Sequence, residues 1–314
     1  MEDERLLYNI AVSYYVNKMT QQEIADANNI SRTKVFRLIT EAQERGIIEV
    51  IVNYPESWHV EAEGKLRDHF QNSNIFVINC KDKSLTDAYD STCEAAADYI
   101  DGIISNKAVF SVSRGKTMYK LVQHLRPRQS YPGMVMRQLS GLLEQREPRF
   151  EEMTLIRKLA DLYSCRAQCF ALPCILETSE LRNQLVESGT VRDIFQAQQG
   201  VSIHCSSVST LEPWAYHLDP LEYQRLEASG AVGCMGGLFL GQNGQVVDTP
   251  LYSRMISPSE KTLREIKTRI CIASGGYKAL PLLALLKSGL ANVYFMDSNL
   301  AIKVLNLLEL EQMT

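Results

Sequence analysis

Apolar residues recur at helical spacing through residues 4–45 of the chain. A first amphipathic helix is predicted over residues 4–17, and two shorter helical patterns follow it, separated by residues 28–31. The residues expected to face inward are Ile24, Ala25 and Ala27 in the second helix and Val35, Leu38, Ile39 and Ala42 in the third. After Gly46, the run 47–52 is predicted to be a strand.

Capping signals mark where the second and third helices begin. Thr20 is followed three residues later by Glu23, which is the spacing of a capping box. Asn29 tolerates the left-handed conformation of a tight turn, and Ser31 is a favourable N-cap for the next helix. Ala25 is small enough to let the two helices approach each other. Two short helices joined by such a turn predict a helix-turn-helix.

The third helix carries cationic side chains on its outer side. In a helix-turn-helix the N-terminal part of this helix enters the major groove, where Arg and Lys bond guanine or phosphate and Thr or Phe can contact a thymine methyl. Residues at helix N-termini are placed to meet phosphate oxygens. The predicted DNA-binding residues are Thr20, Gln21, Ser31, Arg32, Thr33, Lys34, Phe36 and Arg37. The alternative is an ordinary helical hairpin with a solvated charged face.

From about residue 75 the pattern changes to short apolar runs that alternate with helical stretches. The apolar runs are 75–80, 108–113, 134–141, 169–174, 201–209, 231–240, 269–274 and 292–297. The helical stretches are 86–101, 116–126, 150–163, 179–198, 277–287 and 298–309. This alternation predicts βαβ units and a mostly parallel sheet.

The predicted organisation is an α/β protein with a small N-terminal DNA-binding domain. Residues 1–53 are expected to form the helix-turn-helix, which is winged-helix-like, and residues 54–72 a linker helix. Residues 73–314 are expected to form a large, mostly parallel, Rossmann-like α/β domain for effector binding and oligomerisation.

Composition narrows the class of protein. Apolar residues make up 45% of the chain and charged residues 22%, as in ordinary globular proteins. The net charge of −4 means that any contact with nucleic acid must come from a local basic surface. We find no secretory signal and no run of 18 apolar residues, so we expect a cytoplasmic protein without membrane contact.

The eight cysteines form no CxxC pair, and we expect reduced, mostly buried thiols. Cys165, Cys169 and Cys174, with His204 and Cys205 further on, raise the question of a metal site. Their spacing lacks the tight knuckle of structural zinc sites, so we expect neither a metal nor a cofactor.

A basic, glycine-containing turn follows the apolar run 108–113. Residues 113–117 (SRGKT) open a helical stretch, where backbone N–H groups, a hydroxyl and two cations could cradle a phosphate. The alternative is a solvated basic turn. His204 is expected to be a core histidine rather than to line a pocket. The sequence contains no GxSxG elbow, HExxH motif or Walker A motif, and the glycines at 233–237 lack the pattern of a dinucleotide site.

Six blocks of the sequence resemble the SorC family of bacterial sugar-operon regulators. The helix-turn-helix stretch MTQQEIADANNISRTKVFRLITEAQERGIIEVIV (19–52) resembles the family's N-terminus closely, except that Asn28 and Asn29 replace a usual Leu-Gly. The other blocks are SVSRGKT (111–117), RQLSGLL (137–143), GAVGCMGGLFLGQNGQ (230–245), ICIASGGYKALPLLALLKSG (270–289) and VYFMDSNLAIKVL (293–305).

The resemblance implies a sugar-phosphate-isomerase-like domain that binds phosphorylated sugars or related effectors. The effector-binding residues that it implies are Ser113, Arg114, Gly115, Lys116, Thr117, Gln138, Ser140, Gly141, Cys234 and Lys278. Arg114 and Lys116 depart from the usual Trp and Arg, Cys234 from a common Asp, and Ser298-Asn299 from a common Glu. These departures leave the identity of the effector open.

These observations predict a transcriptional regulator of a carbohydrate or polyol catabolic operon. Its expected partners are operator DNA, a sugar, polyol or sugar-phosphate effector that changes operator affinity, and further copies of the chain in a dimer or tetramer. One alternative is a sugar-phosphate isomerase or deaminase, because a fold does not fix a function. A third possibility is a nucleic-acid-binding adaptor whose large domain only oligomerises.

Overall fold

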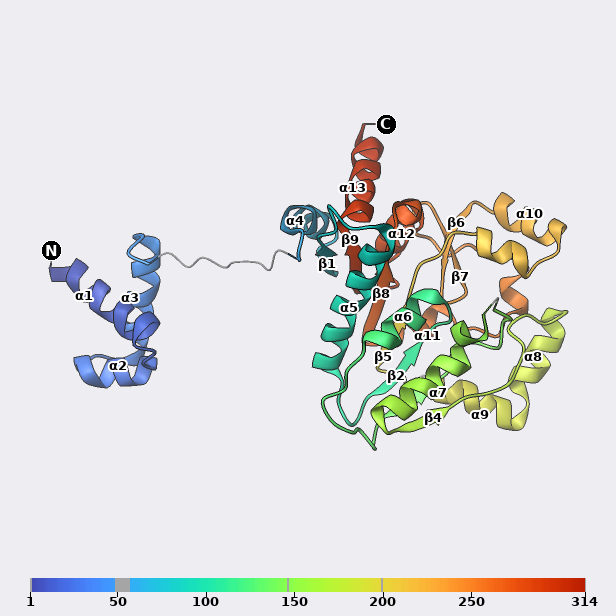
Figure 1. Ribbon diagram of the computed structural model, residues 1–314, viewed down its shortest axis with the longest axis horizontal. Coiled ribbons are helices and arrows are strands. Elements are labelled where there is room, and N and C mark those ends of the chain that lie inside the picture. Colours follow the sequence, from blue (N-terminus) through green and yellow to red (C-terminus); the bar gives the residue numbers. More distant parts are fainter. Residues whose placement is uncertain (1, 49–56, 146, 199, 314) are drawn as a thin grey trace. The chain divides into compact units, whose positions relative to one another are not determined.

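The computed structural model describes residues 2–48, 57–145, 147–198 and 200–313 (Figure 1). The chain divides into two compact units, Met1–Tyr54 and Pro55–Thr314. Within the segment expected to link the domains, helix α4 (Val60–His69) packs against strand β1 (Asn74–Ile78) and helix α13 (Ser298–Gln312) of the large unit.

The small unit is helical, as predicted. Helix α1 (Glu2–Ala11) continues into a π-helical turn, η1 (Val12–Val16), and is followed by α2 (Gln21–Asn28) and α3 (Arg32–Glu44). Its core consists of the buried residues Ile10, Ile24, Ala25, Val35 and Ile39.

Two expectations for the small unit need comment. Ala27 is exposed, so its prediction as an inward-facing residue was wrong; only Ile24 and Ala25 of this short helix reach the core. The predicted strand 47–52 lies mostly outside the described residues. Ile47 and Ile48, which are described, pack against Leu7, Ala11 and Ala42.

The large unit alternates strands and helices. Its first half contains, besides β1 and α4, helix α5 (Leu85–Ile103), β2 (Val109–Val112), α6 (Lys116–His124), β3 (Val135–Arg137), η2 (Pro148–Phe150), α7 (Glu152–Tyr163), β4 (Arg166–Gln168), α8 (Ser179–Glu187) and α9 (Gly189–Gln198). Its second half contains β5 (Ile203–Ser206), η3 (Glu212–Tyr216), α10 (Pro220–Ala228), β6 (Ala231–Met235), β7 (Leu238–Gly241), η4 (Tyr252–Arg254), α11 (Glu260–Glu265), β8 (Thr268–Ala273), η5 (Gly276–Lys278), α12 (Ala279–Ser288), β9 (Val293–Asp297) and α13.

Seven of the strands form one parallel sheet in the order β1-β9-β8-β5-β2-β3-β4. The register pairs Phe110 of β2 with Ile203 of β5, and Ile270 of β8 with Val293 of β9. Strands β2, β5 and β9 are almost wholly buried, as expected for strands of a parallel sheet covered by helices on both sides, whereas the edge strand β4 is partly exposed. The predicted mostly parallel α/β fold is therefore confirmed.

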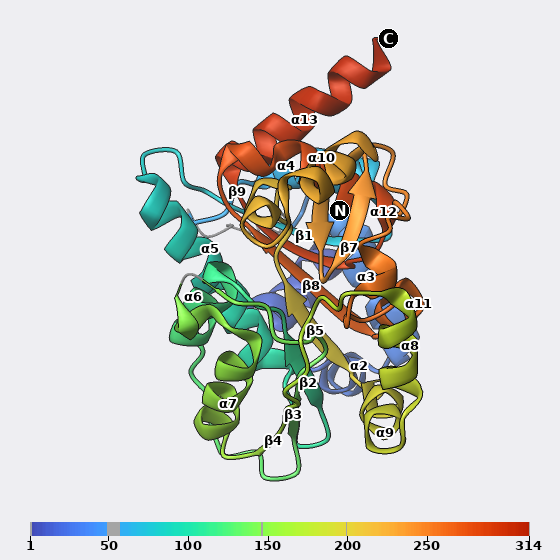
Figure 2. The ribbon, with the colours of Figure 1, turned by 90° about the vertical axis from the view of Figure 1, so that its right-hand side faces the viewer.

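Each side of the sheet packs against its own set of helices. Figure 2 shows α5, α6 and α7 along one side, where their apolar residues share a core with Phe110, Ile203, Ile272 and Phe295. On the other side, α4, α12 and α13 bury Cys271, Tyr294 and Met296 together with the hairpin β6–β7. Both cores are continuous, which holds the carboxyl ends of the central strands in fixed positions.

Three sequence predictions were wrong in detail. The run 231–240 is an antiparallel hairpin outside the main sheet, because Gly236 (φ 60°) and Gly237 (φ 90°) turn the chain back on itself. The stretch 179–198 is two helices, since the chain is extended at Ser188. The run 169–174 is a loop after the edge strand β4, in which only Phe170 and Cys174 are buried; it pairs through an isolated bridge between Leu142 and Pro173.

Candidate functional site

The backbone of the small unit has the geometry of a helix-turn-helix. Thr20 caps α2: its hydroxyl accepts from the N–H of Glu23 (3.3 Å), and the Glu23 carboxylate accepts from the N–H of Thr20 (2.7 Å). These bonds confirm the capping box and lower the pKa of Glu23. Asn29 is left-handed (φ 54°), and the Ser31 hydroxyl accepts from the N–H of Lys34 (3.2 Å). The turn and both caps were therefore predicted correctly.

Helix α3 has an aliphatic inner side and a cationic outer side. Val35, Ile39 and Ala42 are buried against α1 and α2. The predicted reading residues are all exposed: Arg32, Thr33, Lys34, Phe36 and Arg37. Phe36 differs from the others in being a large aromatic residue that is nevertheless 57% exposed.

A hollow of about 600 Å³ opens beside the start of α2. It is lined by Lys18, Thr20, Gln21 and Arg32, together with Tyr14 and Tyr15. Lys18 was not among the predicted DNA-binding residues. The hollow thus gathers side-chain cations and amides next to the exposed N-terminus of a helix, which suits a phosphate of a nucleic-acid backbone.

In the large unit, the order of the strands places a switch point between β2 and β5. From β2 the chain proceeds to β3 and β4 on one side, whereas from β5 it proceeds to β8 and β9 on the other. In open parallel sheets, ligands bind outside the carboxyl ends of the strands at such a point. The loops that begin at Ser113 and Ser207 flank it, and the Ser206 hydroxyl donates to the Ser113 hydroxyl (3.1 Å).

The predicted phosphate loop, residues 113–117, lies at this switch point. Gly115 (φ 116°) N-caps α6, and its N–H donates to the carbonyl of Phe150 (2.8 Å). Lys116 is exposed, while Thr117 is buried and its hydroxyl bonds that of Tyr89 on α5. The positive φ explains the glycine, because other residues rarely adopt this conformation.

Arg114 connects the loop to Gly141, which was predicted to bind the effector, and to Cys174. Its guanidinium donates to the carbonyl of Gly141 (3.5 Å) and to the sulfur of Cys174 (3.4 Å). The Gly141 N–H in turn donates to the carbonyl of Ile256 (2.8 Å). Burial raises the pKa of the Cys174 thiol, so Arg114 meets a neutral sulfur.

Gln138 and Ser140 lie at the end of β3 and are buried. The Gln138 amide donates to the carbonyl of Ser140 (2.7 Å) and accepts from the N–H of Phe170 (3.2 Å). The Ser140 N–H donates to the carboxylate of Glu152 (3.1 Å). Most of these polar groups are therefore bonded within the protein, where they fix the shape of this segment.

Lys278 lies beyond the end of β8 and is 7% exposed. Its ammonium donates to the hydroxyl of Ser207 (3.1 Å), and burial lowers its pKa. Asp297 holds the neighbouring loop, because its carboxylate accepts from the hydroxyl of Ser274 (2.8 Å) and the N–H of Gly275 (2.7 Å). A buried ammonium with a single hydroxyl partner retains donors for a ligand.

Cys234 and His204 are both buried. Cys234 packs with Trp214 and Phe239, and burial raises its pKa to about 12. His204 bonds the Ser111 hydroxyl through Nδ1 (3.3 Å), its Nε2 has no partner among the described atoms, and burial lowers its pKa to about 4. His204 is thus a neutral core histidine, with only one of its two nitrogens satisfied.

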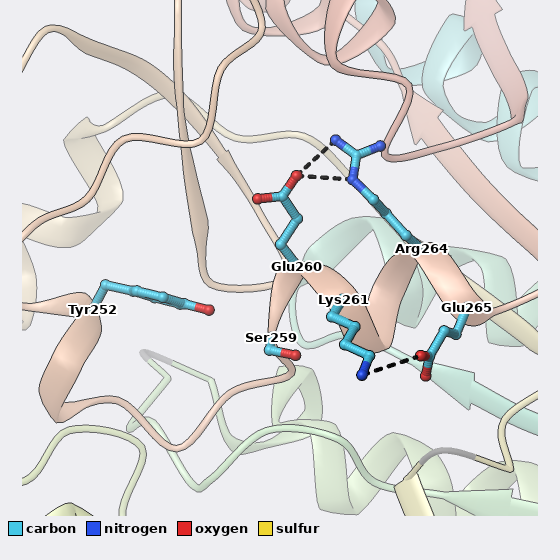
Figure 3. Close-up of a pocket in the computed structure, with 6 residues that line it drawn as sticks. All are labelled: Tyr252, Ser259, Glu260, Lys261, Arg264 and Glu265. Carbon is cyan, nitrogen blue, oxygen red and sulfur yellow. Dashed lines mark hydrogen bonds and ion pairs between the residues drawn. The ribbon is translucent and has the colours of Figure 1, made fainter.

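A second hollow, of about 620 Å³, lies on the surface around α11 (Figure 3). Its charged side chains are paired with one another, Arg264 with Glu260 (2.7 Å) and Lys261 with Glu265 (4.0 Å). Such self-paired, exposed charges leave little to recognise a ligand, so the switch point is the better candidate. Over the described ranges, no group of three or more His, Cys, Asp or Glu residues is arranged to hold a metal ion.

The sequence did not single out several residues at the switch point. Glu151 and Glu152 follow Phe150 at the start of α7; Ser206 ends β5, and Ser207 follows it. Two serines after a buried apolar strand were a usable signal, since the carboxyl ends of parallel strands meet at one edge. The two glutamates resembled ordinary acidic residues in the first turn of a helix.

Comparison with known proteins gives a consistent result. Residues 55–306 match the family model described as "Putative sugar-binding domain". The deoxyribonucleoside regulator of Bacillus subtilis (strain 168) is 23% identical over 310 residues, covering 97% of this chain and 98% of that protein. The sorbitol operon regulator of Klebsiella pneumoniae is 24% identical over 283 residues, covering 88% and 90%.

The fold of the whole chain also has a solved counterpart. The crystal structure of the full-length sorbitol operon regulator SorC from Klebsiella pneumoniae superposes with a TM-score of 0.72 at 23% identity. The match covers 97% of this chain and 100% of that one. The likeness therefore extends over both units and supports the two-part fold.

Proposed function

This chain belongs to the sugar-binding-domain family of SorC-like transcriptional regulators, and from that membership and its geometry we propose that it is an effector-responsive regulator of an operon. The small unit binds operator DNA, and the large unit binds a sugar or polyol effector. The observation that carries the proposal is the exposed cationic side of α3 above a buried aliphatic stripe, in a capped helix-turn-helix.

For the DNA-binding half, we assign the exposed residues of α3 to the major groove. Arg32, Lys34 and Arg37 supply the cations, and Phe36 supplies an apolar contact. Thr20, Gln21 and Ser31 contact phosphates at the helix N-termini. The hollow lined by Lys18 and Arg32 adds a phosphate position next to them.

For the effector half, we place the ligand at the switch point of the sheet. The N-terminus of α6, with Ser113 and Lys116, holds a phosphate, and Lys278 supplies a second cation from the far side of β5. The effector is thus a phosphorylated sugar or polyol of the catabolic route under control. The named relatives are transcriptional regulators, which favours this function over that of an isomerase.

The two halves communicate through assembly. A helix-turn-helix protein reads repeated half-sites as a dimer or a higher oligomer, and we propose that the large unit forms a homo-dimer or tetramer in the cytoplasm. An effector that binds one arrangement of the oligomer more tightly shifts the population towards it, and so changes operator affinity.

The test uses the full chain and a duplex that it selects from a random library. Fluorescence anisotropy measures the affinity for this duplex with and without a panel of sugars, polyols and their phosphates. We expect at least one phosphorylated compound to change the affinity about 5- to 150-fold, the usual range of allosteric coupling. Lys116→Ala should raise the concentration of compound needed for half of this change by about 10-fold.

Lys107→Ala is the matched control, since Lys107 is exposed next to the amino end of β2, away from the switch point. An equal loss of response in both variants would remove the phosphate loop from the proposal. Failure of the chain to select any duplex would contradict DNA binding, and a duplex affinity indifferent to every compound would contradict effector control.

A further inference from the structure

Two acidic side chains at the switch point have carboxylate oxygens without hydrogen-bond partners. Glu152 is 1% exposed; its Oε1 accepts from the N–H groups of Leu139 (2.7 Å) and Ser140 (3.1 Å), whereas its Oε2 is buried and unpartnered in the described structure. Both carboxylate oxygens of Glu151 are also buried and unpartnered. The N–H groups of Glu152 and Leu143 lie near Glu151 but outside standard hydrogen-bond geometry.

Arg114 lies near both carboxylates and is paired with neither. Its positive charge opposes the rise in pKa that burial causes at Glu151 and Glu152. The guanidinium bonds the carbonyl of Gly141 and the sulfur of Cys174, and within the described parts of the chain no carboxylate oxygen lies within 4.0 Å of it. This differs from a buried salt bridge, in which the charges would satisfy each other directly.

The acidic pair is held next to the predicted phosphate loop. The carbonyl of Phe150, the residue before Glu151, accepts from the N–H of Gly115 (2.8 Å). The Phe150 ring contacts Tyr119 of α6 edge-on, with ring centroids 5.3 Å apart. The starts of α6 and α7 are thus fixed side by side, and a ligand phosphate at α6 would bring its neighbouring atoms towards Glu151 and Glu152.

The chemistry of the cluster favours hydroxyl groups as its ligand. Buried carboxylate oxygens without donors are costly, and burial raises the pKa of Glu152 to about 7 and also raises that of Glu151. A cation would satisfy the carboxylates but would be repelled by Arg114. A hydroxyl group donates to a carboxylate while accepting from a guanidinium, so adjacent hydroxyls fit both charges at once.

We propose that Glu151, Glu152 and Arg114 form a subsite that reads adjacent hydroxyl groups on the uncharged part of the effector. The proposal rests on the proposed function, because it assigns a role to residues of the same effector site. It adds two specificity-determining residues and states what they recognise: hydroxyl donors of a sugar or polyol rather than its phosphate.

The experiment measures binding to the full chain by isothermal titration calorimetry at pH 8. The probes are D-ribose 5-phosphate and D-glucose 6-phosphate, their 2-deoxy analogues, D-glucitol 6-phosphate and the unphosphorylated forms. In Glu151→Gln, we expect affinity for the best hydroxylated probe to fall by about 10- to 100-fold, because a charge-assisted hydrogen bond is replaced by a neutral one. We expect the preference for that probe over an analogue lacking a contacted hydroxyl to shrink by a similar factor.

Glu147→Gln is the matched control, since Glu147 is exposed in the same segment and pairs with Arg149 outside the cluster. Glu152→Gln should act like Glu151→Gln; if the loss of its bonds to Leu139 and Ser140 disturbs folding, Glu151→Gln still decides, because Glu151 makes no such bond.

Two outcomes would separate the hypotheses. A probe that binds Glu151→Gln as tightly as the unmodified chain, or that loses affinity equally with its deoxy analogue, would overturn the subsite alone. If no probe binds the unmodified chain, the effector half of the proposed function fails, and the subsite fails with it.

Discussion

The two candidate sites differ in where their polar groups lie. In the small unit, the DNA-binding residues are exposed on one helix, and the protein's own structure needs little from them beyond the caps of Thr20 and Ser31. At the switch point, Arg114, Glu152 and Lys278 come from separate segments and are largely withdrawn from solvent. One site depends on the outer side of a local motif, and the other on tertiary packing.

This difference has an energetic consequence. Exposed cations on α3 keep their hydration until DNA arrives, so they cost the free protein little. Buried charges without full partners are unfavourable in the free protein, and a ligand that satisfies them recovers that energy as affinity. We therefore expect substitutions in the large unit to alter stability and pH dependence, and substitutions on α3 to alter binding and its dependence on salt.

The largest expected effect concerns Glu152 and pH. Its pKa is raised from 4.5 to about 7, so between these values the folded protein holds a proton that the unfolded chain releases. Stability should consequently fall as pH rises across this window, by about 3 kcal/mol in all, and Glu152→Gln should remove that fall. Urea denaturation followed by tryptophan fluorescence measures it, because both tryptophans, Trp58 and Trp214, lie in the large unit.

His204 titrates with the opposite sign and must be separated from Glu152. Its pKa is lowered from 6.5 to about 4, so its contribution to stability is lost as pH falls through this window. The two slopes oppose each other between about pH 4.5 and 6.5, so the Glu152 effect is taken as the difference in stability between the unmodified chain and Glu152→Gln from pH 4.5 to 7, in which the His204 contribution cancels. If the unmodified chain and Glu152→Gln showed parallel pH profiles there, the buried-charge half of the comparison would be wrong.

The next effect tests the exposed half of the comparison. Arg32→Ala and Arg37→Ala should each weaken binding to the selected duplex by about 1–3 kcal/mol if the side chain reads a base. A lost phosphate contact should instead lower the salt dependence by about one unit of slope. Anisotropy titrations over a range of salt concentrations measure both quantities.

Arg45→Ala is the control for these variants, because Arg45 is an exposed cation at the other end of α3, paired with Glu41. Since all three substitutions remove one exposed positive charge, a general loss of charge would affect them equally. Equal effects would therefore argue against α3 as the reading helix.

The same contrast explains what could be predicted from the sequence. The capping box at Thr20, the left-handed Asn29 and the stripe of Val35 and Ile39 were all predicted, because local signals along the chain encode them. The alternation of strands and helices also gave the parallel sheet. The order of its strands was not predicted, because strand pairing depends on contacts between distant segments.

For the same reason, only part of the site in the large unit could be predicted from the sequence. The loop 113–117 was found because a strand, a glycine and a helix start follow one another directly. Glu151 and Glu152 become candidate site residues only in the folded chain, because the hydrogen bond between Gly115 and Phe150 and the position of Arg114 bring them to the switch point. The hairpin at Gly236–Gly237 was missed because two glycines within an apolar run were treated as part of one strand.

The smallest expected effect concerns the Thr20 cap of α2, and it tests whether the helix-turn-helix is stable independently of the large unit. Thr20→Ala removes the hydroxyl that accepts from the Glu23 N–H, and should destabilise α2 by about 1 kcal/mol. Hydrogen exchange in residues 20–28 measures this change, and exchange in α5 and α12 should not respond, because those helices belong to the other unit.

Thr40→Ala is the control, since Thr40 lies inside α3 and its hydroxyl donates only to the carbonyl of Phe36; alanine there should be neutral or slightly stabilising. Faster exchange confined to α2 would mean that the DNA-binding geometry is stabilised within the small unit. A matching change in the large unit would show that the two units unfold together, and would contradict the comparison between a local and a tertiary site.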